Sequence, residues 1–589
     1  MWLERIRHRL RGRQQARPPR RRPAPAVSDQ VAASTGWRSL VPGIAAARTY
    51  QRSWLRFDLV AGVVLAAILV PQGMAYAELA GLPAVTGLYT TIACLVGYAV
   101  MGPSKILVLG PDSAVSPLIF AAIAPLVVVT ADPATAITLA GMMAVMVGLI
   151  LIGLGVGKLG FVADLLSKEV QVGYMNGLAI TIFVGQLPKL CGFSTDADGF
   201  VAEVQAFVDG FPDRNPTAVW LGLATLAILL VLPRFTRTIP AVLLAVVGAT
   251  VVTGLFDLDI ATVGTLPKGL PRPALPWTSV SDVAPLLVAA VGITLVSLTD
   301  TIATSTAFSA RRGEEVKPNK EMIGIGAANV AAGFFQGFAV STSSSRTAVA
   351  DQTGAKSQVT GLIGAGIVAL LLLVFNGLLA NLPQTALAAV VIAAAISLVD
   401  LATLRRYLGL HRSSLFLSLV ATGGVVFFGV LQGILIAVVL SILLFFRRNW
   451  WPHGEVLGRV DGEEGWHSEV GGHTIEERPG ILVFRWEAPL FFANAGMFRD
   501  RVRELVRANQ PAWVVLQCEE ITDIDVTAAD VLEQLDEELN EQGVHLAFVE
   551  LRARLTSLVH DYGLFATLDA DHFYGSIDEA LAAIDEARE

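Results

Sequence analysis

The sequence predicts an all-α polytopic membrane domain of fourteen segments, followed by a small α/β domain at the carboxyl end. The 589 residues are 53% hydrophobic and 16% charged, with a mean hydropathy of +0.59, whereas soluble proteins carry about a quarter charged residues. Apolar stretches fill residues 56–446, and residues 451–589 have a soluble composition. Charge changes at the same place. Residues 1–450 hold 33 Lys and Arg against 22 Asp and Glu (+11), and residues 451–589 hold 10 against 29 (−19).

Residues 1–50 form a basic tail, with nine arginines between positions 5 and 22. No apolar core with a small-residue cleavage site follows within the first 30 residues, so the tail does not read as a signal peptide. An arm of this kind can bind nucleic acid. Beside a membrane domain, however, we expect no nucleic-acid partner but a cytoplasmic segment that faces membrane lipid.

The membrane domain, residues 51–448, contains fourteen segments that approach the roughly 20 apolar residues of a spanning helix. They lie near residues 57–78, 84–101, 105–129, 134–157, 168–187, 216–233, 239–256, 281–308, 319–337, 338–355, 358–380, 384–402, 413–430 and 431–446. With the N-terminus inside, thirteen Lys and Arg residues fall in inside loops and four in outside loops. This asymmetry predicts a multi-pass protein of the inner (plasma) membrane with both termini in the cytoplasm.

Two of the predicted spans are interrupted at membrane depth. In the third span, a Gly-Pro pair at residues 110–111 ends a β-like run, and Asp112 or Ser113 can cap a helix that begins there. In the tenth span, the serine-rich run 341–345 supplies hydroxyls and backbone N–H groups for a second helix start. The interruptions are seven spans apart, which suggests two repeats of seven spans that face each other.

Arg346 follows the serine-rich run and has to lie at membrane depth. A cation is costly there unless it is paired or faces a wet cavity. Two helices that begin in mid-membrane would aim their positive dipole ends at one point. Together with Arg346 they predict an anion-binding site. The alternative is that Arg346 pairs with a carboxylate such as Asp351 and only joins helices.

Two other spans contribute polar side chains. In the first, Pro71 bends or breaks the helix, and Gln72 and Tyr76 lie one turn apart, where they can present an amide and a phenol. An ordinary proline kink is the alternative.

In the eighth predicted span, Asp300 and Thr304 are one turn apart. Such a carboxylate can exchange protons or help hold a small cation; the alternatives are a neutral structural Asp or a salt bridge to the tenth-span arginine. Asp112 is a weaker candidate for this role, because capping explains it.

In these segments the chain resembles the SulP (sulfate permease) family of anion transporters, over nearly its whole length from about residue 48. The matching signatures are VPQGMAYA (70–77), AGLP (80–83), GLY (87–89), GPDS (110–113), RRGEE (311–315), NKE (319–321), GFFQGF (333–338) and STSSSRT (341–347). Any one of these runs is weak by itself, but the ordered set is highly specific.

The resemblance implies a seven-plus-seven inverted repeat with core and gate subdomains, and an anion held between the third and tenth helices. The implied substrate-binding residues are Gln72, Tyr76, Ser113, Ala114, Ser344, Ser345 and Arg346. The resemblance implies that Asp300 and Thr304 bind the coupling ion. This ion would be H⁺, or Na⁺ held with the help of Ser344. We expect no other cofactor, no resident metal and no catalytic residue, and the three cysteines fit no metal spacing.

A Gly- and His-containing linker (449–478) leads to the soluble domain, residues 479–589. Strand and helix patterns alternate through this domain, which predicts a small α/β fold. The expected strands are Ile481–Trp486, Leu490–Ala493, Trp513–Cys518 and Val544–Val549, and the expected helices are Met497–Ala508, Asp525–Gln542, Leu551–His560 and Ser576–Ala587.

The soluble domain resembles STAS domains, in which a loop pattern close to Asp-Ser-Ser-Gly carries a phosphorylatable serine. Asp525 and Thr527 occupy the Asp and hydroxyl positions of that loop, and we therefore expect them to be regulatory. The alternative is that one of them only caps the following helix. As a regulatory module, the domain would dimerise or bind a cytoplasmic protein or nucleotide.

These features predict secondary active transport of a small inorganic or carboxylate anion by alternating access, with sulfate as the first choice and a homodimer as the assembly. Symport of bicarbonate or a C4-dicarboxylate, an uncoupled anion channel and a nucleobase transporter of the same fold are the alternatives. A membrane-tethered signalling protein with a STAS output is an alternative of another class. The chain contains no Walker motif, and we expect no enzyme activity.

Overall fold

The computed structural model describes most of the chain from residue 41 onward. The described residues are 41–127, 132–160, 167–195, 197, 199–235, 240–312, 315–410, 412–460, 462, 465–468, 475–568 and 570–588. Residues 1–40 of the predicted basic tail and parts of the predicted linker lie outside this set. The tail's last residues form the short helix α2 (Pro42–Thr49).

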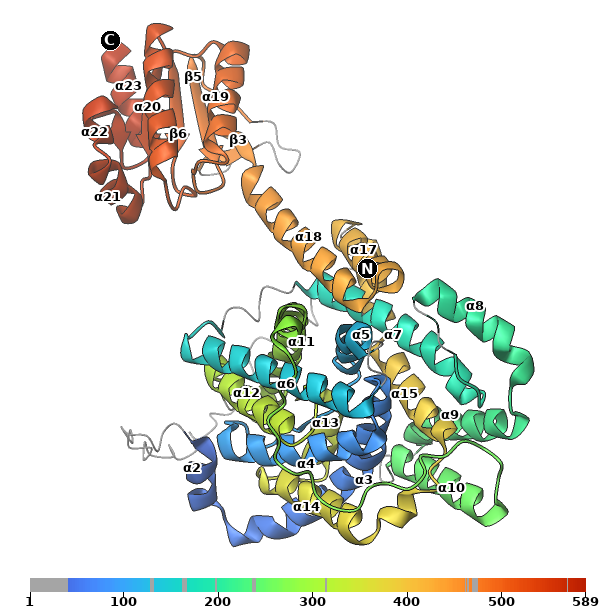
Figure 1. The fold of residues 1–589 in the computed structure, drawn as a ribbon. Helices are drawn as coiled ribbons and strands as arrows, with labels where there is room; N and C mark the ends of the chain where they lie inside the picture. The colour runs from blue at the N-terminus through green and yellow to red at the C-terminus, as the bar shows by residue number, and fades with distance from the viewer. Residues whose placement is uncertain are drawn as a thin grey trace, which may run out of the picture. The chain divides into compact units, whose positions relative to one another are not determined.

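Every predicted span contains a helix, which confirms the polytopic helical fold (Figure 1). The helices are α3 (Leu55–Leu79), α4 (Ala84–Met101), α5 (Ser116–Val127), α6 (Pro133–Val156), α7 (Lys168–Leu190), α9 (Pro216–Phe235), α10 (Ala241–Phe256), α11 (Val280–Arg312), α12 (Pro318–Phe334), α13 (Ser344–Gln352), α14 (Val359–Val374), α15 (Gln384–Leu398), α17 (Arg412–Phe428) and α18 (Val430–Trp450). Seven helices among the described residues are long and apolar enough to cross a membrane, and several shorter helices are also apolar.

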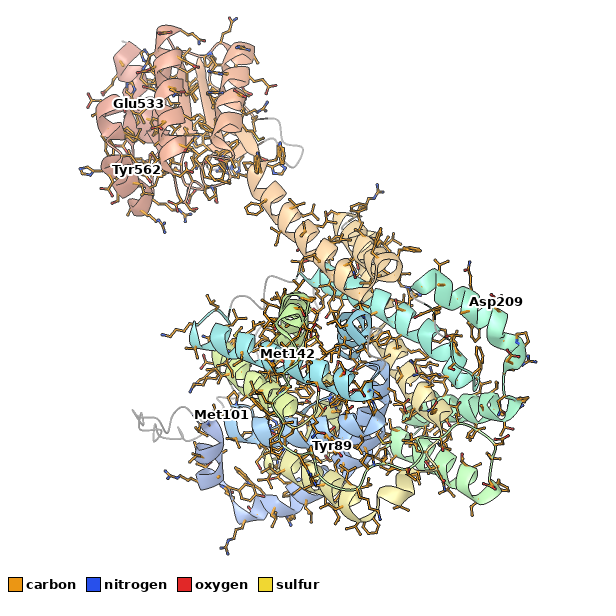
Figure 2. The ribbon with its side chains drawn as sticks, in the orientation of Figure 1. Tyr89, Met101, Met142, Asp209, Glu533 and Tyr562 are labelled. Carbon is orange, nitrogen blue, oxygen red and sulfur yellow. The ribbon has the colours of Figure 1, made fainter. Side chains whose placement is uncertain are left out.

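The structure also contains elements that the span count did not predict. Helix α8 (Phe200–Gly210) lies between α7 and α9, and α16 (Leu401–Leu410) follows α15. Both are amphipathic, with polar residues such as Asp209 of α8 (Figure 2) among the apolar ones. A search for long continuous apolar runs passes over such helices, because they are short and polar residues interrupt their apolar face.

Contacts along the chain define two units. The first comprises Met1–Ala163, Gly185–Asp196 and Gln205–Ala395, and the second comprises Asp164–Val184, Ala197–Val204 and Ile396–Glu589. Helices α3 to α6 and α11 to α14, which include both interrupted spans, belong to the first unit. The carboxyl-terminal α/β domain belongs to the second.

The α/β domain is built on a six-stranded sheet in the order β4-β3-β5-β6-β7-β8. Its strands are β3 (Gly454–Gly458), β4 (His467–Ser468), β5 (Ile481–Trp486), β6 (Trp513–Gln517), β7 (His545–Val549) and β8 (Phe573–Tyr574). Strands β5 to β8 are parallel, and β3 is antiparallel to both neighbours. Strand β3 lies within the predicted linker, so part of that segment belongs to the sheet.

Helices cover both faces of this sheet (Figure 1). They are α19 (Ala495–Asn509), α20 (Val526–Glu541), α21 (Ala553–Asp561), α22 (Leu564–Thr567) and α23 (Ile577–Arg588). Side chains of β5 alternate between two cores: Leu482 and Phe484 pack with α19 and α20, whereas Ile481 and Val483 pack with α23. This period-two alternation is what the parallel, doubly covered sheet requires.

The predicted strand at residues 490–493 is not formed. Leu490 makes an isolated bridge with Ile524, and a turn follows. Asn494 stabilises the turn, because its side chain accepts from Phe491 N (3.0 Å) and donates to Pro489 O (2.8 Å). The apolar run 490–493 therefore contributes Leu490 to the core without forming a strand.

In the first unit, α6 and α12 approach closely through glycines spaced seven residues apart. A Cβ atom on Gly333 would lie 2.5 Å from the Gly141 carbonyl oxygen, and one on Gly148 would lie 2.6 Å from the Gly326 oxygen. Small residues at such contacts let membrane helices pack through their backbones. Helix α12 carries Asn329, which is central to the site described below, so this packing positions the site.

We therefore expect Gly148→Leu to destabilise the protein, because a side chain there collides with the backbone of α12. Overpacking of this kind costs about 1–3 kcal/mol. Gly153→Leu is the matched control on the same helix, since a Cβ atom at Gly153 meets nothing within 4 Å. The melting temperature of the detergent-solubilised protein should fall for the first variant and not for the second; equal melting temperatures would contradict the packing argument.

Candidate anion-binding site

The two interrupted spans meet in a short antiparallel pairing inside the first unit. Strand β1 (Leu109–Gly110) pairs with β2 (Ser341–Thr342), with Leu109 opposite Thr342. Helices α5 and α13 begin a few residues after these strands. The two segments, more than two hundred residues apart in the sequence, therefore bring two helix N-termini into one region.

Each of the two helix starts is capped by a side chain. The Ala114 N–H donates to Asp112 Oδ1 (2.9 Å), and Arg346 N donates to Ser343 Oγ (3.4 Å). Of the two predicted caps in the third span, Asp112 therefore caps the turn that leads into α5, and the helix itself begins at Ser116. Ser113 and Ala114 are buried in the turn that precedes α5.

Arg346 is the largest buried polar side chain of this region, with only 1% of its surface exposed. Its Nη1 donates to the Pro111 carbonyl (2.6 Å), and its Nη2 lies 3.7 Å from Asp112 Oδ2. Among the described residues, neither Nη2 nor Nε has a hydrogen-bond partner. Gly110 lies directly against the guanidinium, because a Cβ atom there would be 3.2 Å from Nη1. The arginine thus faces the start of α5, and its Nη2 and Nε donors remain without a hydrogen-bond partner.

The structure does not pair Arg346 with Asp351, the partner considered from the sequence. Asp351 instead accepts from Arg312 at the end of α11, at 2.6 Å from Nη2 and 3.2 Å from Nε. The carboxylate recorded beside Arg346 comes from the other interrupted span. This cross-span ion pair links the two half-helices.

Tyr76 of α3 lies at the same place. It is buried, and it lies close to Ser113, Asp112 and Arg346. Gln72 is half-buried one turn earlier. Helix α3 is continuous through Pro71, so of the predicted bend or break, the break does not occur. The nearby Gly73 serves close packing instead, since a Cβ atom on Gly87 of α4 would be only 1.9 Å from the Gly73 oxygen.

Helix α11 runs beside β2 and the start of α13. Thr304 Oγ1 lies 2.6 Å from Ser344 Oγ, and Thr301 Oγ1 lies 2.8 Å from Thr342 Oγ1. Asp300 is half-buried on this helix, one turn before Thr304. The structure therefore brings Thr304 and Ser344 together as the predicted cation set requires. Within the part of the chain that the structure describes, no cluster of His, Cys, Asp or Glu could hold a metal by itself.

The serines that precede Arg346 differ in their surroundings. Ser344 and Ser345 are exposed, whereas Ser341 and Arg346 are buried. Ser345 Oγ lies 3.1 Å from Ser343 Oγ. Two hydroxyls at the α13 start are thus accessible, whereas the guanidinium that follows them is buried.

Sequence reasoning missed the residues that hold the extended segment before β2. Asn329 of α12 accepts from Val340 N (2.9 Å) and donates to Val340 O (3.2 Å). Thr90 Oγ1 of α4 accepts from Phe338 N (3.1 Å), and Ser297 of α11 also donates to Val340 O (3.1 Å). The available signal was a lone polar side chain inside an apolar helix, which usually satisfies buried backbone groups.

In the α/β domain, the predicted regulatory loop begins helix α20. Asp525 caps this helix by accepting from Ala528 N (2.8 Å), and it also accepts from Phe492 N (2.8 Å). Thr527 is exposed in the first turn. Tyr562 (Figure 2), which follows α21, donates to Ile524 O (3.3 Å) and packs beside the same loop. The carboxylate thus performs the capping role, and the hydroxyl remains accessible.

Comparisons with known proteins agree with the class of protein that this fold defines, a polytopic membrane transporter with a carboxyl-terminal α/β domain. The family model described as "Sulfate permease family" matches residues 55–421, and the one described as "STAS domain" matches residues 473–580. The chain belongs to the sulfate permease family and carries a STAS domain.

Individual relatives span most of the chain. A Mycobacterium tuberculosis protein named "Probable sulfate transporter Rv1739c" is 40% identical over 555 residues, which cover 93% of this chain and 98% of that protein. "Sulfate transporter 4.1, chloroplastic" of Arabidopsis thaliana is 28% identical over 91% of this chain and 81% of its own. The solved structure of the murine anion transporter Slc26a9 in the inward-facing state has a TM-score of 0.85 at 22% identity, over 95% and 97% of the two chains, which shows the shared fold.

We expect Asn329→Ala to destabilise the site, because it leaves the buried Val340 N–H without its partner and removes one donor from the Val340 carbonyl. An unsatisfied buried backbone group costs about 1–3 kcal/mol. Thr225→Ala is the matched control: Thr225 is also buried, but its hydroxyl donates to Leu221 O in its own helix (2.7 Å). Thermal unfolding in detergent should show a larger loss for Asn329→Ala, and similar losses would argue against its role in holding the segment.

Proposed function

We propose that the protein is a secondary transporter that carries a small anion across the membrane by alternating access, with sulfate as the first substrate to test. The observation that carries the proposal is the buried Arg346 guanidinium, which has unused donors and faces the capped start of α5. This arrangement suits an oxyanion better than a cation or a neutral ring.

The electrostatics favour an anion at this position. Each helix N-terminus carries the equivalent of about half a positive charge, and α5 and α13 both begin here. A guanidinium adds a full charge and planar donors that match the paired oxygens of sulfate or a carboxylate. Ser344 and Ser345, which are accessible, can supply further donors.

The relatives support sulfate over other anions, since those from M. tuberculosis and A. thaliana are named sulfate transporters. Bicarbonate is the next candidate, because a bicarbonate transporter, the cyanobacterial BicA, has a membrane domain with a TM-score of 0.59 over 67% of this chain. C4-dicarboxylates present the same paired oxygens and belong in the same test.

For the coupling ion we propose H⁺ or Na⁺ at Asp300, with Thr304 and Ser344 as the neighbouring oxygen donors. Their hydroxyls lie 2.6 Å apart, and carboxylate and hydroxyl oxygens are the ligands that hard cations prefer. An uncoupled anion channel is the alternative that the experiments below separate from this one.

In this proposal the protein lies in the inner membrane with both termini in the cytoplasm, as the loop charges favour. The STAS domain would bind a second copy or a cytoplasmic protein. Two strongly exposed apolar side chains support this, Phe492 (69% exposed) and Val526 (60% exposed), beside the Asp525 loop. Phosphorylation of the accessible Thr527 would place negative charge at the same surface.

We expect Arg346→Ala to abolish anion binding and to lower uptake into proteoliposomes by about 100-fold, because it removes a charge and several charge-assisted hydrogen bonds. The measurement is uptake of labelled sulfate, bicarbonate and fumarate. Arg346→Lys keeps the charge but loses the planar donors, and an intermediate rate is expected. Uptake by Arg346→Ala at the wild-type rate would refute a central site built on this residue.

Asp300→Asn is expected to lower the stimulation of uptake by an imposed H⁺ or Na⁺ gradient, because the amide can neither bind a proton nor neutralise a cation. Uptake under each gradient separately identifies the ion. Asp282→Asn, in the first turn of the same helix, serves as the control and should behave as wild type. If a gradient stimulates uptake by Asp300→Asn as strongly as by the wild type, Asp300 is not the coupling residue. If neither gradient changes uptake by the wild type, an uncoupled channel is favoured.

A further inference from the structure

Asp112 performs two tasks with one carboxylate. Its Oδ1 accepts from Ala114 N (2.9 Å) and so caps the start of α5, while its Oδ2 lies 3.7 Å from Arg346 Nη2. The Asp112 side chain is 14% exposed and that of Arg346 is 1% exposed. A cap alone does not require a charge, because Asn and Ser cap helices as well as Asp does. The second oxygen therefore needs a separate explanation.

The contact between Asp112 and Arg346 is an ion pair without a hydrogen bond. At 3.7 Å the two atoms are beyond hydrogen-bonding distance, and Nη2 and Nε have no hydrogen-bond partner among the described residues. A buried guanidinium needs a countercharge nearby, and the carboxylate supplies it. These donors are buried and unpaired, so an oxyanion that reaches them does not have to break a hydrogen bond first.

A substrate anion on those donors would sit beside the Asp112 carboxylate. Two negative groups would then compete for one guanidinium, and like charges in a buried site favour protonation of one of them. Sulfate resists protonation near neutral pH, so the proton would go to Asp112. Because binding linkage is reciprocal, an anion that favours protonated Asp112 also binds more tightly when Asp112 is protonated.

We propose that Asp112 is a proton-coupling residue of the anion site: its ionised carboxylate balances Arg346, takes up one proton when the substrate anion binds there, and releases it when the anion leaves. The proton adds to Oδ2, which becomes a hydroxyl that can donate to the anion, while Oδ1 continues to cap α5. This inference rests on the proposed anion site and adds a proton carrier separate from Asp300.

Among the described residues, two titratable or charged side chains act directly on Asp112. Tyr76 on α3 and Arg346 on α13 act on it directly, and Cys94 on α4 lies close enough to feel the charge of Arg346. Asp300 lies on α11, which packs against α5. Tyrosine and cysteine are neutral near pH 7 unless strongly perturbed, which leaves Asp112 and Asp300 as the groups whose protonation can respond to the anion.

The chain contains a matched control for the capping role. Asp132 caps α6 in the same way, with its Oδ1 accepting from Ala134 N (3.1 Å), but it is exposed and its other oxygen lies 3.2 Å from the Thr135 hydroxyl rather than near an arginine. Asp132→Asn therefore tests what a neutral cap does by itself. Asp112→Asn keeps the capping oxygen and removes only the charge that would compete with the substrate.

The test is calorimetric titration of the full-length protein in detergent with sulfate, between about pH 5.5 and about pH 7.5, in two buffers of different ionisation enthalpy. The heat difference between buffers gives the protons taken up per sulfate bound. For the wild type we expect uptake that approaches one proton, and an affinity that falls by up to about tenfold per pH unit as pH rises. Sulfate keeps its charge over this range, so the substrate does not cause the change.

The variants identify the residue that takes up the proton. Asp112→Asn should bind sulfate more tightly than the wild type at the upper pH, take up no proton, and change its affinity by less than about twofold over the range. Asp132→Asn should keep the wild-type proton uptake. If Asp112→Asn keeps the uptake, or if Asp300→Asn abolishes it, Asp112 is not the carrier. Weaker sulfate binding by Asp112→Asn would likewise contradict the proposal and leave Asp112 as a cap.

Two results separate this proposal from the proposed function. If the wild type binds none of sulfate, bicarbonate and fumarate, or if Arg346→Ala binds as tightly as the wild type, the anion site itself is refuted. If sulfate binds through Arg346 and no proton is taken up by the wild type, the anion site stands and the role of Asp112 is refuted. The wild-type measurement needs no variant, so misfolding cannot obscure it.

Discussion

The hydrogen bond from Arg346 Nη1 to the Pro111 carbonyl (2.6 Å) is the contact around which the first unit is arranged. The Pro111 carbonyl lies before the first turn of α5 and is not used by the N–H groups of that helix, so the interruption of the third span leaves it available to the guanidinium. Arg346 itself follows the start of α13, so the tenth span is interrupted there too. The pairing of β1 with β2 satisfies the backbone groups that both interruptions set free.

So short a pairing needs support from its neighbours, and this explains polar residues in otherwise apolar helices. Asn329 satisfies both backbone groups of Val340, and Thr90 binds Phe338 N. Helix α12, which carries Asn329, also packs closely on α6 through the glycines of both helices. Further along, Asp58 of α3 accepts from Lys356 N (2.7 Å) near the start of α14. The packing of small residues and the polar bonds are thus parts of one arrangement.

The sequence predicted the residues that interrupt the apolar pattern, but it did not predict the contacts that these residues make with other spans. Serines and an arginine inside an apolar run stand out along one chain, so both half-helices and Arg346 could be found. The partner of Arg346 could not be found in this way. Asp351 was considered because it is near in sequence, but it binds Arg312. The carboxylate beside Arg346 is that of Asp112. Spacing fixes which residues share a helix face and says nothing about which helix that face meets. The same limit hid Asn329, whose partner is set by the fold.

The pairing of Arg346 with Asp112 bears on how a carrier could return without substrate. Moving a bare cation through a low-dielectric region is expensive, and alternating access requires the empty site to change its exposure as well as the loaded one. An ionised carboxylate 3.7 Å from the guanidinium keeps the empty site close to neutral. A bound anion adds negative charge beside that carboxylate, and a proton on Asp112 would offset one unit of it. For a monovalent anion such as bicarbonate the site would then be as neutral as the empty one; for sulfate the proton would halve the added charge and so lower the cost of moving the loaded site.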